Sequence, residues 1–218
     1  MPVQVVCISR SLAAGGEEIG QAVAARLGFR VIDSEIIERA AEKAELDPSR
    51  VAQTEQRQSL IRRLIASMVP ATASGRLGAR YYAVNPIVAL ALGQTREDRL
   101  RGLIREVIEE IAAEGRAVIV AHAASMALAG RDEVLRVLVT ASPEERADRL
   151  VWASGLSRTV AEQAVRNSDL ERAHYFKSFY QLDEELPTHY DLVVNTDRLP
   201  PEQAVAIIVA AARGPGGV

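Results

Sequence analysis

The fold is decided by the stretch Val3-Gln-Val-Val-Cys-Ile-Ser9, followed by Arg10-Ser-Leu-Ala-Ala-Gly15-Gly16-Glu-Glu-Ile-Gly20. Its first part is a short apolar run rich in β-branched residues, which is typical of a buried strand. After the two glycines, apolar residues recur at helical spacing as far as Leu27, and Gly28 closes the segment. The sequence therefore predicts a strand, a tight polar loop and a helix, in that order.

This order of elements is the frame of a phosphate-binding loop. Gly15 and Gly16 let the backbone approach a ligand closely, and the first N–H groups of the helix point outward with the positive end of its dipole. The strict P-loop pattern, G-x-x-x-x-G-K-[ST], would need a glycine at Arg10, a lysine at Gly16 and a hydroxyl residue at Glu17. Only Gly15 fits, so the spacing alone leaves phosphate binding and an ordinary strand-to-helix turn both open.

Three charges bear on the function of this loop. Arg10 is its only cation and could reach a β- or γ-phosphate in place of the missing lysine, although a guanidinium is a planar fork and not a point charge. Glu17 and Glu18 favour the start of the helix by roughly 0.3–1 kcal/mol each. They would repel a triphosphate unless both side chains turn outward or share a magnesium ion.

Composition places the chain among ordinary globular proteins. It has 218 residues, 48% of them hydrophobic and 25% charged, which suits one domain with a substantial core. The net charge of −3 gives no pull towards nucleic acid or an anionic membrane. Cys7 is the single cysteine, so no internal disulfide forms.

Neither a leader nor a membrane span is indicated. The first strand begins almost at once, with no charged leader before it, and the longest apolar run, Ile87 to Leu92, is far too short to cross a bilayer. We therefore expect a cytoplasmic protein with no nucleic-acid partner, no membrane partner and no metal held by its own side chains. The sequence does not indicate an oligomeric state.

Further strands alternate with helices along the chain. Strands are predicted at 29–33, 116–120, 134–139 and 190–195, and the helices with the clearest signals at 34–45, from Thr95 to Gly115, after Ser142 and after Pro200. The stretch 47–67 has a charged helical pattern, and 69–85 is typical of a loop or lid margin. This alternation predicts right-handed crossovers and a parallel sheet with helices on both faces.

Two polar residues stand at predicted strand ends. Asp33 could cap the following helix, or it could contact a nucleotide at the carboxyl edge of the sheet, where open α/β sheets bind their ligands. His122 follows the third long apolar strand, and a lone histidine there is more often structural than catalytic.

A locally basic segment follows Gly155. A salt-bridged helix surface is the ordinary explanation of such a charge run. Here the charges are interleaved with aromatic residues, whose side chains must be buried in a core or in a groove. The segment contains Arg158, Arg166, Asp169, Arg172, Tyr175, Phe176, Lys177, Phe179 and Tyr180.

Taken together, these landmarks resemble the cytidylate-kinase-like branch of the P-loop nucleoside monophosphate kinases. The resemblance is carried, in order, by Ile8-Ser9-Arg10, Gly15-Gly16-Glu-Glu-Ile19-Gly20, Leu27-Gly28, Asp33-Ser-Glu-Ile-Ile37, Val118-Ile-Val120, Arg146-Ala-Asp-Arg149, Asp169-Leu-Glu-Arg172 and Tyr190-Asp-Leu-Val-Val-Asn-Thr196. It implies a three-layer α/β P-loop kinase fold, with a five-stranded parallel sheet flanked by helices. It also implies a single domain over 1–218, a helical acceptor-binding insertion at 46–95 and an arginine-bearing lid at 155–187.

The chemistry that the resemblance implies is transfer of the γ-phosphoryl group of ATP to CMP or dCMP, assisted by Mg²⁺. Such catalysis consists mostly of positioning and charge neutralisation. The resemblance implies that the residues binding the phosphates of ATP are Ser9, Arg10, Gly15, Gly16, Glu17 and Glu18. It assigns the acceptor nucleotide to Asp33, Arg39 and His122. With Arg10 as the catalytic cation of the loop, Arg149, Arg166 and Arg172 would close over the transferring phosphate, and Asp169 would aid the acceptor or an arginine.

The chain departs from its look-alikes at three places. They commonly have Tyr-Gly-Ser-Gly-Gly at Leu12-Ala-Ala-Gly15-Gly16, a basic or neutral residue at Glu17, and Gly-Arg at Ala121-His122. Three functions are therefore considered: a cytidylate-kinase-type phosphotransferase, a catalytically degenerate nucleotide-binding regulatory module, and a kinase for another small phosphate acceptor. The unusual segment 72–85 suggests the third.

Overall fold

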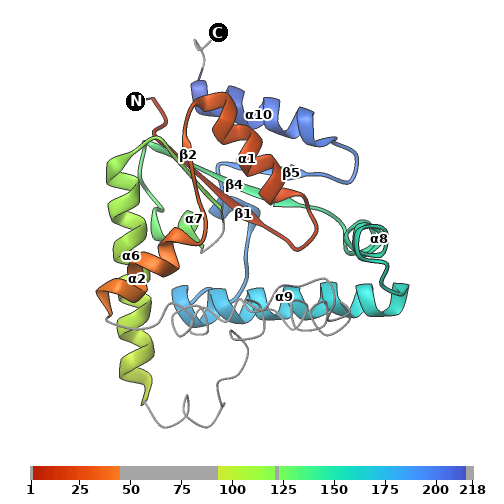
Figure 1. The fold of residues 1–218 in the computed structure, drawn as a ribbon, viewed down its shortest axis with the longest axis horizontal. Coiled ribbons are helices and arrows are strands. Elements are labelled where there is room, and N and C mark those ends of the chain that lie inside the picture. Colours follow the sequence, from red (N-terminus) through yellow and green to blue (C-terminus); the bar gives the residue numbers. More distant parts are fainter. Residues whose placement is uncertain (1, 45–92, 121–122, 215–218) are drawn as a thin grey trace, which may run out of the picture.

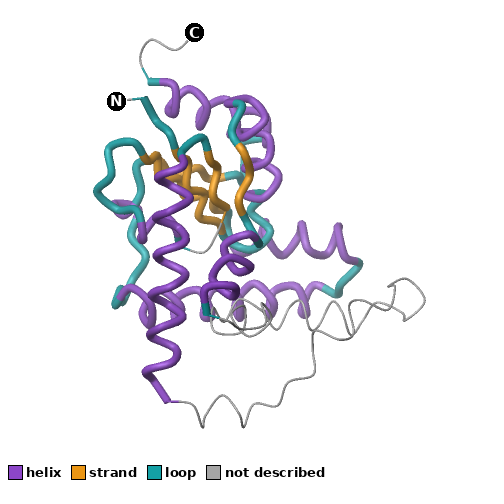
Figure 2. Tube along the Cα trace, turned by 60° about the vertical axis from the view of Figure 1, so that its left-hand side comes forward, coloured by secondary structure: helices purple, strands orange, loops and turns teal. Residues whose placement is uncertain are grey.

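A computed structural model describes residues 2–44, 93–120 and 123–214, and it contains a five-stranded parallel sheet (Figures 1 and 2). The strand order is β2-β3-β1-β4-β5, and every neighbouring pair runs parallel. The strands are β1 (Val5–Arg10), β2 (Arg30–Ile32), β3 (Ala117–Val120), β4 (Val134–Thr140) and β5 (Leu192–Asn195). The predicted sheet is thus confirmed. The fifth strand begins two residues later than predicted, because the Asp191 side chain bonds Arg136 just before the ladder starts.

Helices cover both faces of this sheet. The α-helices of the described residues are α1 (Gly16–Leu27), α2 (Glu35–Lys43), α6 (Gly93–Glu114), α7 (Ala124–Ala127), α8 (Pro143–Ser154), α9 (Arg158–Tyr180) and α10 (Pro201–Arg213). Side chains alternate across a strand, so Val5 and Cys7 of β1 pack with α2, α6 and α7, whereas Val6 and Ile8 pack with α1 and α10. The result is the predicted three-layer architecture.

The long helix α9 lies on the side of the sheet opposite α1 and α10 (Figure 1). Local signals fix the helices at this end of the molecule. Ser142 caps α8 by accepting a hydrogen bond from the backbone of Glu145 at 3.3 Å, and Gly155 ends it at φ 66°. Ser157 then caps α9, accepting from the backbone of Val160 at 3.4 Å.

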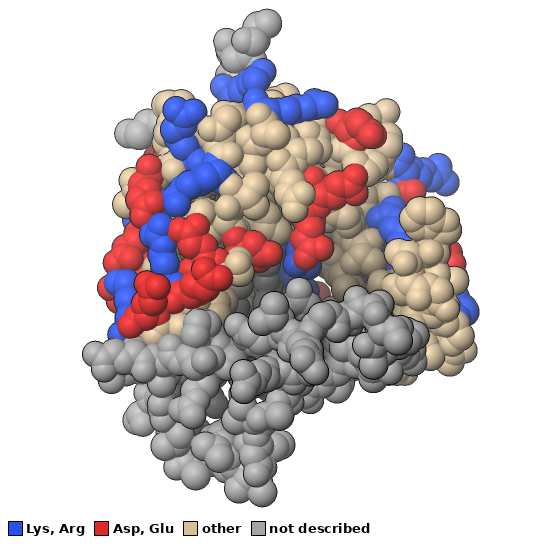
Figure 3. Space-filling view, viewed as in Figure 1, with Lys and Arg blue, Asp and Glu red and all other residues tan. Residues whose placement is uncertain are grey.

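Ion pairs join α2 to the end of α6 on the face shown in Figure 3, where acidic and basic side chains are interspersed. Lys43 contacts both Glu106 and Glu110 at 2.7 Å. Arg39 contacts Glu114 at 2.8 Å, and Arg30 also pairs with Glu114. Exposed pairs of this kind add little stability individually, so the buried apolar face between these helices holds them together.

Parts of the sequence prediction lie outside the described residues. These are the helical stretch 47–67, the loop 69–85, nearly all of the proposed insertion 46–95, and His122. Within the described part of the chain, the helices are all too short or too polar to cross a bilayer.

Candidate functional site

The loop between β1 and α1 presents backbone N–H groups at the carboxyl edge of the sheet. Gly15 is the N-cap of α1, at φ 81°. Glycine adopts this left-handed conformation without strain, and it brings no side chain to occupy the first N–H groups of the helix. Together with the helix dipole, those groups make the loop suitable for an anion such as phosphate.

The side chain of Arg10 explains why Gly16 stands at the position of the missing lysine. A Cβ atom at Gly16 would lie 2.6 Å from Cβ and 3.1 Å from Cδ of Arg10, closer than non-bonded carbon atoms normally approach. The Arg10 side chain therefore fills the space through which a lysine at this position would leave the backbone. The two departures from the strict P-loop pattern are physically linked, and the loop keeps one cation.

Arg10 forms an ion pair with Glu17 at the start of the following helix. The Arg10 side chain is 23% exposed and that of Glu17 is 63% exposed, so the carboxylate reaches Arg10 from the solvent side. Glu17 turns towards Arg10 and not outward. A phosphate bound by Arg10 would have to compete with this carboxylate.

A pocket of about 810 Å³ opens over the loop. This volume suits a ligand of nucleotide size. One wall is the loop and the first turn of α1, and the other comes from α8 and the segment after β5. The lining residues are 10–19, Gln21, Arg149, Leu150, Ala153 and 196–201.

Arg149 and Thr196 brace the loop within this pocket. Arg149 Nη1 donates to the carbonyl of Ala13 at 3.3 Å and to Thr196 Oγ1 at 3.0 Å, and its Nη2 donates to the Thr196 carbonyl at 2.7 Å. Thr196 Oγ1 in turn donates to the carbonyl of Ala14 at 3.0 Å. Ala13 lies at φ 58°, a left-handed conformation that alanine adopts only at a cost. These contacts hold the loop in its strained shape.

A buried arginine joins α8 to α9. The Arg146 side chain is 5% exposed, and its Nη1 and Nη2 donate to the two carboxylate oxygens of Asp169 at 2.8 and 2.7 Å. Its Nε donates to the carbonyl of Ala141 at 3.1 Å. This bidentate geometry is the strongest arrangement that an arginine and a carboxylate can form. Asp169 therefore fixes an arginine, one of the two roles expected of it.

Arg172 of α9 reaches the carboxyl end of β1. Its Nη1 donates to the carbonyl of Arg10 at 2.9 Å and its Nη2 to Ser9 Oγ at 2.8 Å. Its Nε and Nη2 also donate to the carboxylate of Glu185, at 2.6 and 2.5 Å. Burial by itself lowers the pKa of Arg172, but the hydrogen bonds and charge of Glu185 outweigh it, so the pKa is raised and the group stays charged.

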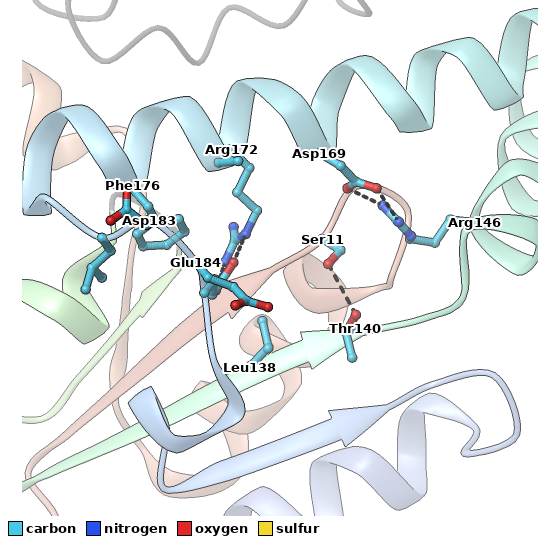
Figure 4. Close-up of a pocket in the computed structure, with 12 residues that line it drawn as sticks. Ser11, Leu138, Thr140, Arg146, Asp169, Arg172, Phe176, Asp183 and Glu184 are labelled. Carbon is cyan, nitrogen blue, oxygen red and sulfur yellow. Dashed lines mark hydrogen bonds and ion pairs between the residues drawn. The ribbon is translucent and has the colours of Figure 1, made fainter.

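A smaller cavity of about 330 Å³ lies between α9, β4 and the segment after α9 (Figure 4). Arg146 and Arg172 both line it, each held by its own carboxylate, as Figure 4 shows for the pair with Asp169. Ser11 lines this cavity as well as the larger pocket, and its Oγ lies 3.3 Å from Thr140 Oγ1. The start of the phosphate loop therefore borders both cavities.

The three arginines expected over one phosphate do not meet at one point in this structure. Arg149 lines the larger pocket and Arg172 the smaller one. Arg166 is exposed on α9, where it donates to Gln163 at 3.0 Å, and it lines neither cavity. The spacing of Arg166 and Arg172 puts them on different faces of the same helix.

Of the expected acceptor residues, Asp33 and Arg39 line neither cavity. Arg39 pairs with Glu35 at 2.5 Å and with Glu114 at 2.8 Å. Glu114 lies close to the amino end of β3, whereas the phosphate loop follows the carboxyl end of β1. The Arg39–Glu114 pair and the loop are therefore at opposite edges of the parallel sheet. Asp33 is exposed directly after β2, and the N-cap of α2 is Ser34, so the capping role considered for Asp33 is not observed. His122 lies outside the described residues.

Four residues of the site had no assigned role in the sequence analysis. Arg146 and Thr196 belong to stretches that carried the family resemblance, and a polar residue after a buried strand marks Thr196. Tyr190 is predicted only as the first residue of a strand. Glu185 lies in a segment without periodicity, so the sequence does not indicate its partners, Arg172 and Tyr190, which are determined by tertiary packing.

The sheet order β2-β3-β1-β4-β5 and the glycine loop between β1 and α1 define a P-loop kinase fold, that of a kinase-like phosphotransferase. Two solved structures are similar to this chain over nearly its whole length. An uncharacterised protein from Eubacterium ventriosum has a TM-score of 0.63 at 12% identity, over 94% of this chain and 96% of that one. The TT1252 protein of Thermus thermophilus has a TM-score of 0.50 at 19% identity, over 99% and 100%.

The model of the cytidylate kinase-like family matches residues 5–198, so the chain belongs to that family. The relationship predicted from the ordered landmarks is thus confirmed. A cytidylate kinase of Archaeoglobus fulgidus is 36% identical over 78 residues. That match covers 35% of this chain and 43% of the length of the relative.

Proposed function

We propose that the chain transfers the γ-phosphoryl group of ATP to CMP or dCMP in the cytoplasm. The observation that carries this proposal is the pocket of about 810 Å³ whose wall is the phosphate loop and the first turn of α1. Membership of the cytidylate kinase-like family and the partial match to a cytidylate kinase support the choice of acceptor.

The residues of the loop fit a magnesium–nucleotide complex. Gly15 and Gly16 would hold phosphate oxygens through backbone N–H groups, with Ser9 supporting the strand end and Arg10 supplying the charge. Among the described residues, no three histidine, cysteine or acidic side chains gather as metal ligands. Mg²⁺ is commonly held by substrate phosphates and one or two carboxylates, and Glu17 and Glu18 stand within reach of that role. Bound there, Mg²⁺ would neutralise phosphate charge.

The remaining assignments follow from the family. The chain would act as a single domain, with acceptor contacts from Asp33, Arg39, His122 and the insertion at 46–95. The lid at 155–187 would bring Arg166, Asp169 and Arg172 to the transferring phosphate, together with Arg149. Two contacts support this part: Arg172 touches Ser9 and the Arg10 carbonyl, and Arg149 touches the carbonyl of Ala13.

The test is phosphoryl transfer from labelled ATP with magnesium, offered CMP, dCMP, UMP, AMP and GMP in parallel. We expect turnover on CMP or dCMP that collapses in the Arg10→Ala protein. The matched control is Arg105→Ala, which removes an exposed arginine that pairs with Glu109 of the same helix. A folded, magnesium-replete protein that phosphorylates none of the five would overturn the proposal.

A catalytically degenerate nucleotide-binding module is the second candidate, and the Arg10–Glu17 ion pair favours it. A carboxylate that neutralises the cation of the loop weakens the charge stabilisation on which phosphoryl transfer depends. This candidate predicts nucleotide binding without turnover. Binding followed by turnover only on an acceptor outside the panel would instead point to a kinase for another small phosphate acceptor.

A further inference from the structure

Four polar groups form a closed ring at the carboxyl end of β1. Arg172 Nη2 donates both to Ser9 Oγ and to Glu185, and the Tyr190 hydroxyl donates to Glu185. The Tyr190 oxygen also lies 3.2 Å from Ser9 Oγ, which closes the ring. Its members come from β1, from α9 and from the segment between α9 and β5, so the ring ties the start of the chain to residues 172–190.

The ring is shielded from water. Ser9 is 2% exposed and Tyr190 7% exposed, while the side chains of Arg172 and Glu185 are 13% and 18% exposed. Burial and the neighbouring Glu185 carboxylate raise the pKa of Tyr190 well above its ordinary value, so its hydroxyl stays protonated and can donate. In such surroundings a charge–charge hydrogen bond is stronger than at the surface, and removing one partner is costly.

Glu185 gives the Arg172 guanidinium a charged partner, and the Phe176 ring lies against the same group, with 4.8 Å between its centroid and Cζ. An arginine side chain has many rotamers, and the carbonyl of Arg10 and the hydroxyl of Ser9 are neutral acceptors that water could replace. The carboxylate of Glu185 accepts two hydrogen bonds from the guanidinium in a bidentate pair, and it also accepts a hydrogen bond from the Tyr190 hydroxyl. Arg172 then holds the backbone of Arg10, the residue that begins the phosphate loop.

We infer that Glu185 is a positioning residue: held by Tyr190, it fixes Arg172 against Ser9 and the Arg10 carbonyl and thereby sets the conformation of the phosphate loop. The consequence for nucleotide affinity rests on the proposed function. The consequence for the loop itself does not, because the ring consists only of the chain's own side chains.

The first test is hydrogen–deuterium exchange of the backbone amides at 10–16 in nucleotide-free protein. Glu185→Gln keeps the shape of the side chain but removes its charge, and Tyr190→Phe removes only the hydroxyl. Both variants should exchange severalfold faster in this loop than the wild type. Unchanged exchange in both would overturn the inference.

The matched control is Asp191→Asn, at the residue after Tyr190. Asp191 forms a similar bidentate pair with Arg136, at 2.6 and 3.1 Å, but Arg136 lies within β4, outside the loop. This variant should lose stability and leave exchange at 10–16 unchanged. An equal rise in all three variants would mean that the ring acts only through global stability, and the inference would fail.

The second test is a double-mutant cycle on ATP affinity. Glu185→Gln should weaken ATP binding roughly tenfold, the scale on which outer partners of a functional group act. In an Arg172→Met background the same change should have no further effect, because Glu185 acts through Arg172. Additive losses would contradict that route. If the wild type binds no nucleotide, the proposed function fails, and the exchange experiment alone decides the inference.

Discussion

At the scale of single residues, the phosphate loop is defined by the relation between Arg10 and Gly16. The sequence shows a missing glycine and a missing lysine at positions 10 and 16. The structure adds that the side chain of Arg10 covers Gly16, with 2.6 Å between its Cβ and any Cβ at position 16. This link could not be predicted from the sequence, because it depends on the direction of a side chain in a folded loop.

The carboxylate of Glu17 sets how strongly Arg10 attracts a phosphate. We expect Glu17→Gln to strengthen the binding of magnesium-free ATP by roughly twofold to fivefold, the equivalent of an exposed ion pair, because Arg10 is released for the ligand. The gain should shrink at high ionic strength, where exposed charges are screened. Titration calorimetry at two salt concentrations measures both effects.

Glu18→Gln is the control for this prediction. Glu18 has the same charge at the next position and also lines the pocket, so it tests whether the specific pair with Arg10 matters. Weaker binding of magnesium-free ATP by Glu17→Gln would contradict our expectation.

At the scale of elements, the contact of α1 with β3 depends on Gly20. A Cβ there would lie 2.7 Å from Cγ2 of Val120, so Gly20→Ala should force the helix from the sheet and cost about 1–3 kcal/mol of unfolding free energy. Gly102→Ala on α6, where a Cβ would meet no atom within 4 Å, should instead stabilise by about 0.5–1 kcal/mol. Urea unfolding compares the two, and equal effects would refute the packing argument.

The α8–α9 junction depends on the Arg146–Asp169 pair. Asp169→Asn leaves a buried guanidinium without its countercharge. We expect the free energy of unfolding to fall by about 1–3 kcal/mol, and the loss is limited because the Asp169 side chain is 42% exposed. Asp148→Asn breaks the exposed pair with Arg158 and should change stability little. Thermal unfolding of both variants tests this, and a larger loss in Asp148→Asn would show that burial is not the deciding factor.

Elements defined by local signals could be predicted, whereas contacts between elements could not. Ser142 and Gly155 bound α8 as expected, because capping needs only neighbouring residues. The pair of Arg172 with Glu185 spans 13 positions, and Asp169 and Arg146 are 23 apart, so neither follows from periodicity. The basic segment after Gly155 was visible, but its arginines point to different neighbours.

At the scale of the whole molecule, acid sensitivity depends in part on Asp191. Burial alone raises the pKa of Asp191, but the hydrogen bonds and charge of Arg136 outweigh it and leave the pKa below its ordinary value of 3.8. The contribution of Asp191 to the stability of the folded protein is therefore present above pH 3.8, and it is lost as the pH falls through the lower pKa of the folded state.

Asp191→Asn should accordingly lower stability at neutral pH and flatten its decline below about pH 4. Unfolding free energies measured between pH 2 and pH 7 check this, with the wild type alongside. An unchanged decline in the variant would mean that other carboxylates control acid unfolding. Glu114 is one such group, because its pKa is lowered chiefly by the hydrogen bond from Arg39.

We propose that this molecule binds a nucleoside triphosphate on a P-loop in which Arg10 replaces the lysine. The most direct measurement is calorimetric titration of wild type and Arg10→Ala with ATP and magnesium. We expect the wild type to bind ATP, and we expect the binding free energy to be weaker by roughly 1.5–3 kcal/mol in the variant, because charge-assisted hydrogen bonds to phosphate are lost. Equal affinity of the two proteins would contradict it and would leave Arg10 a structural residue that only covers Gly16.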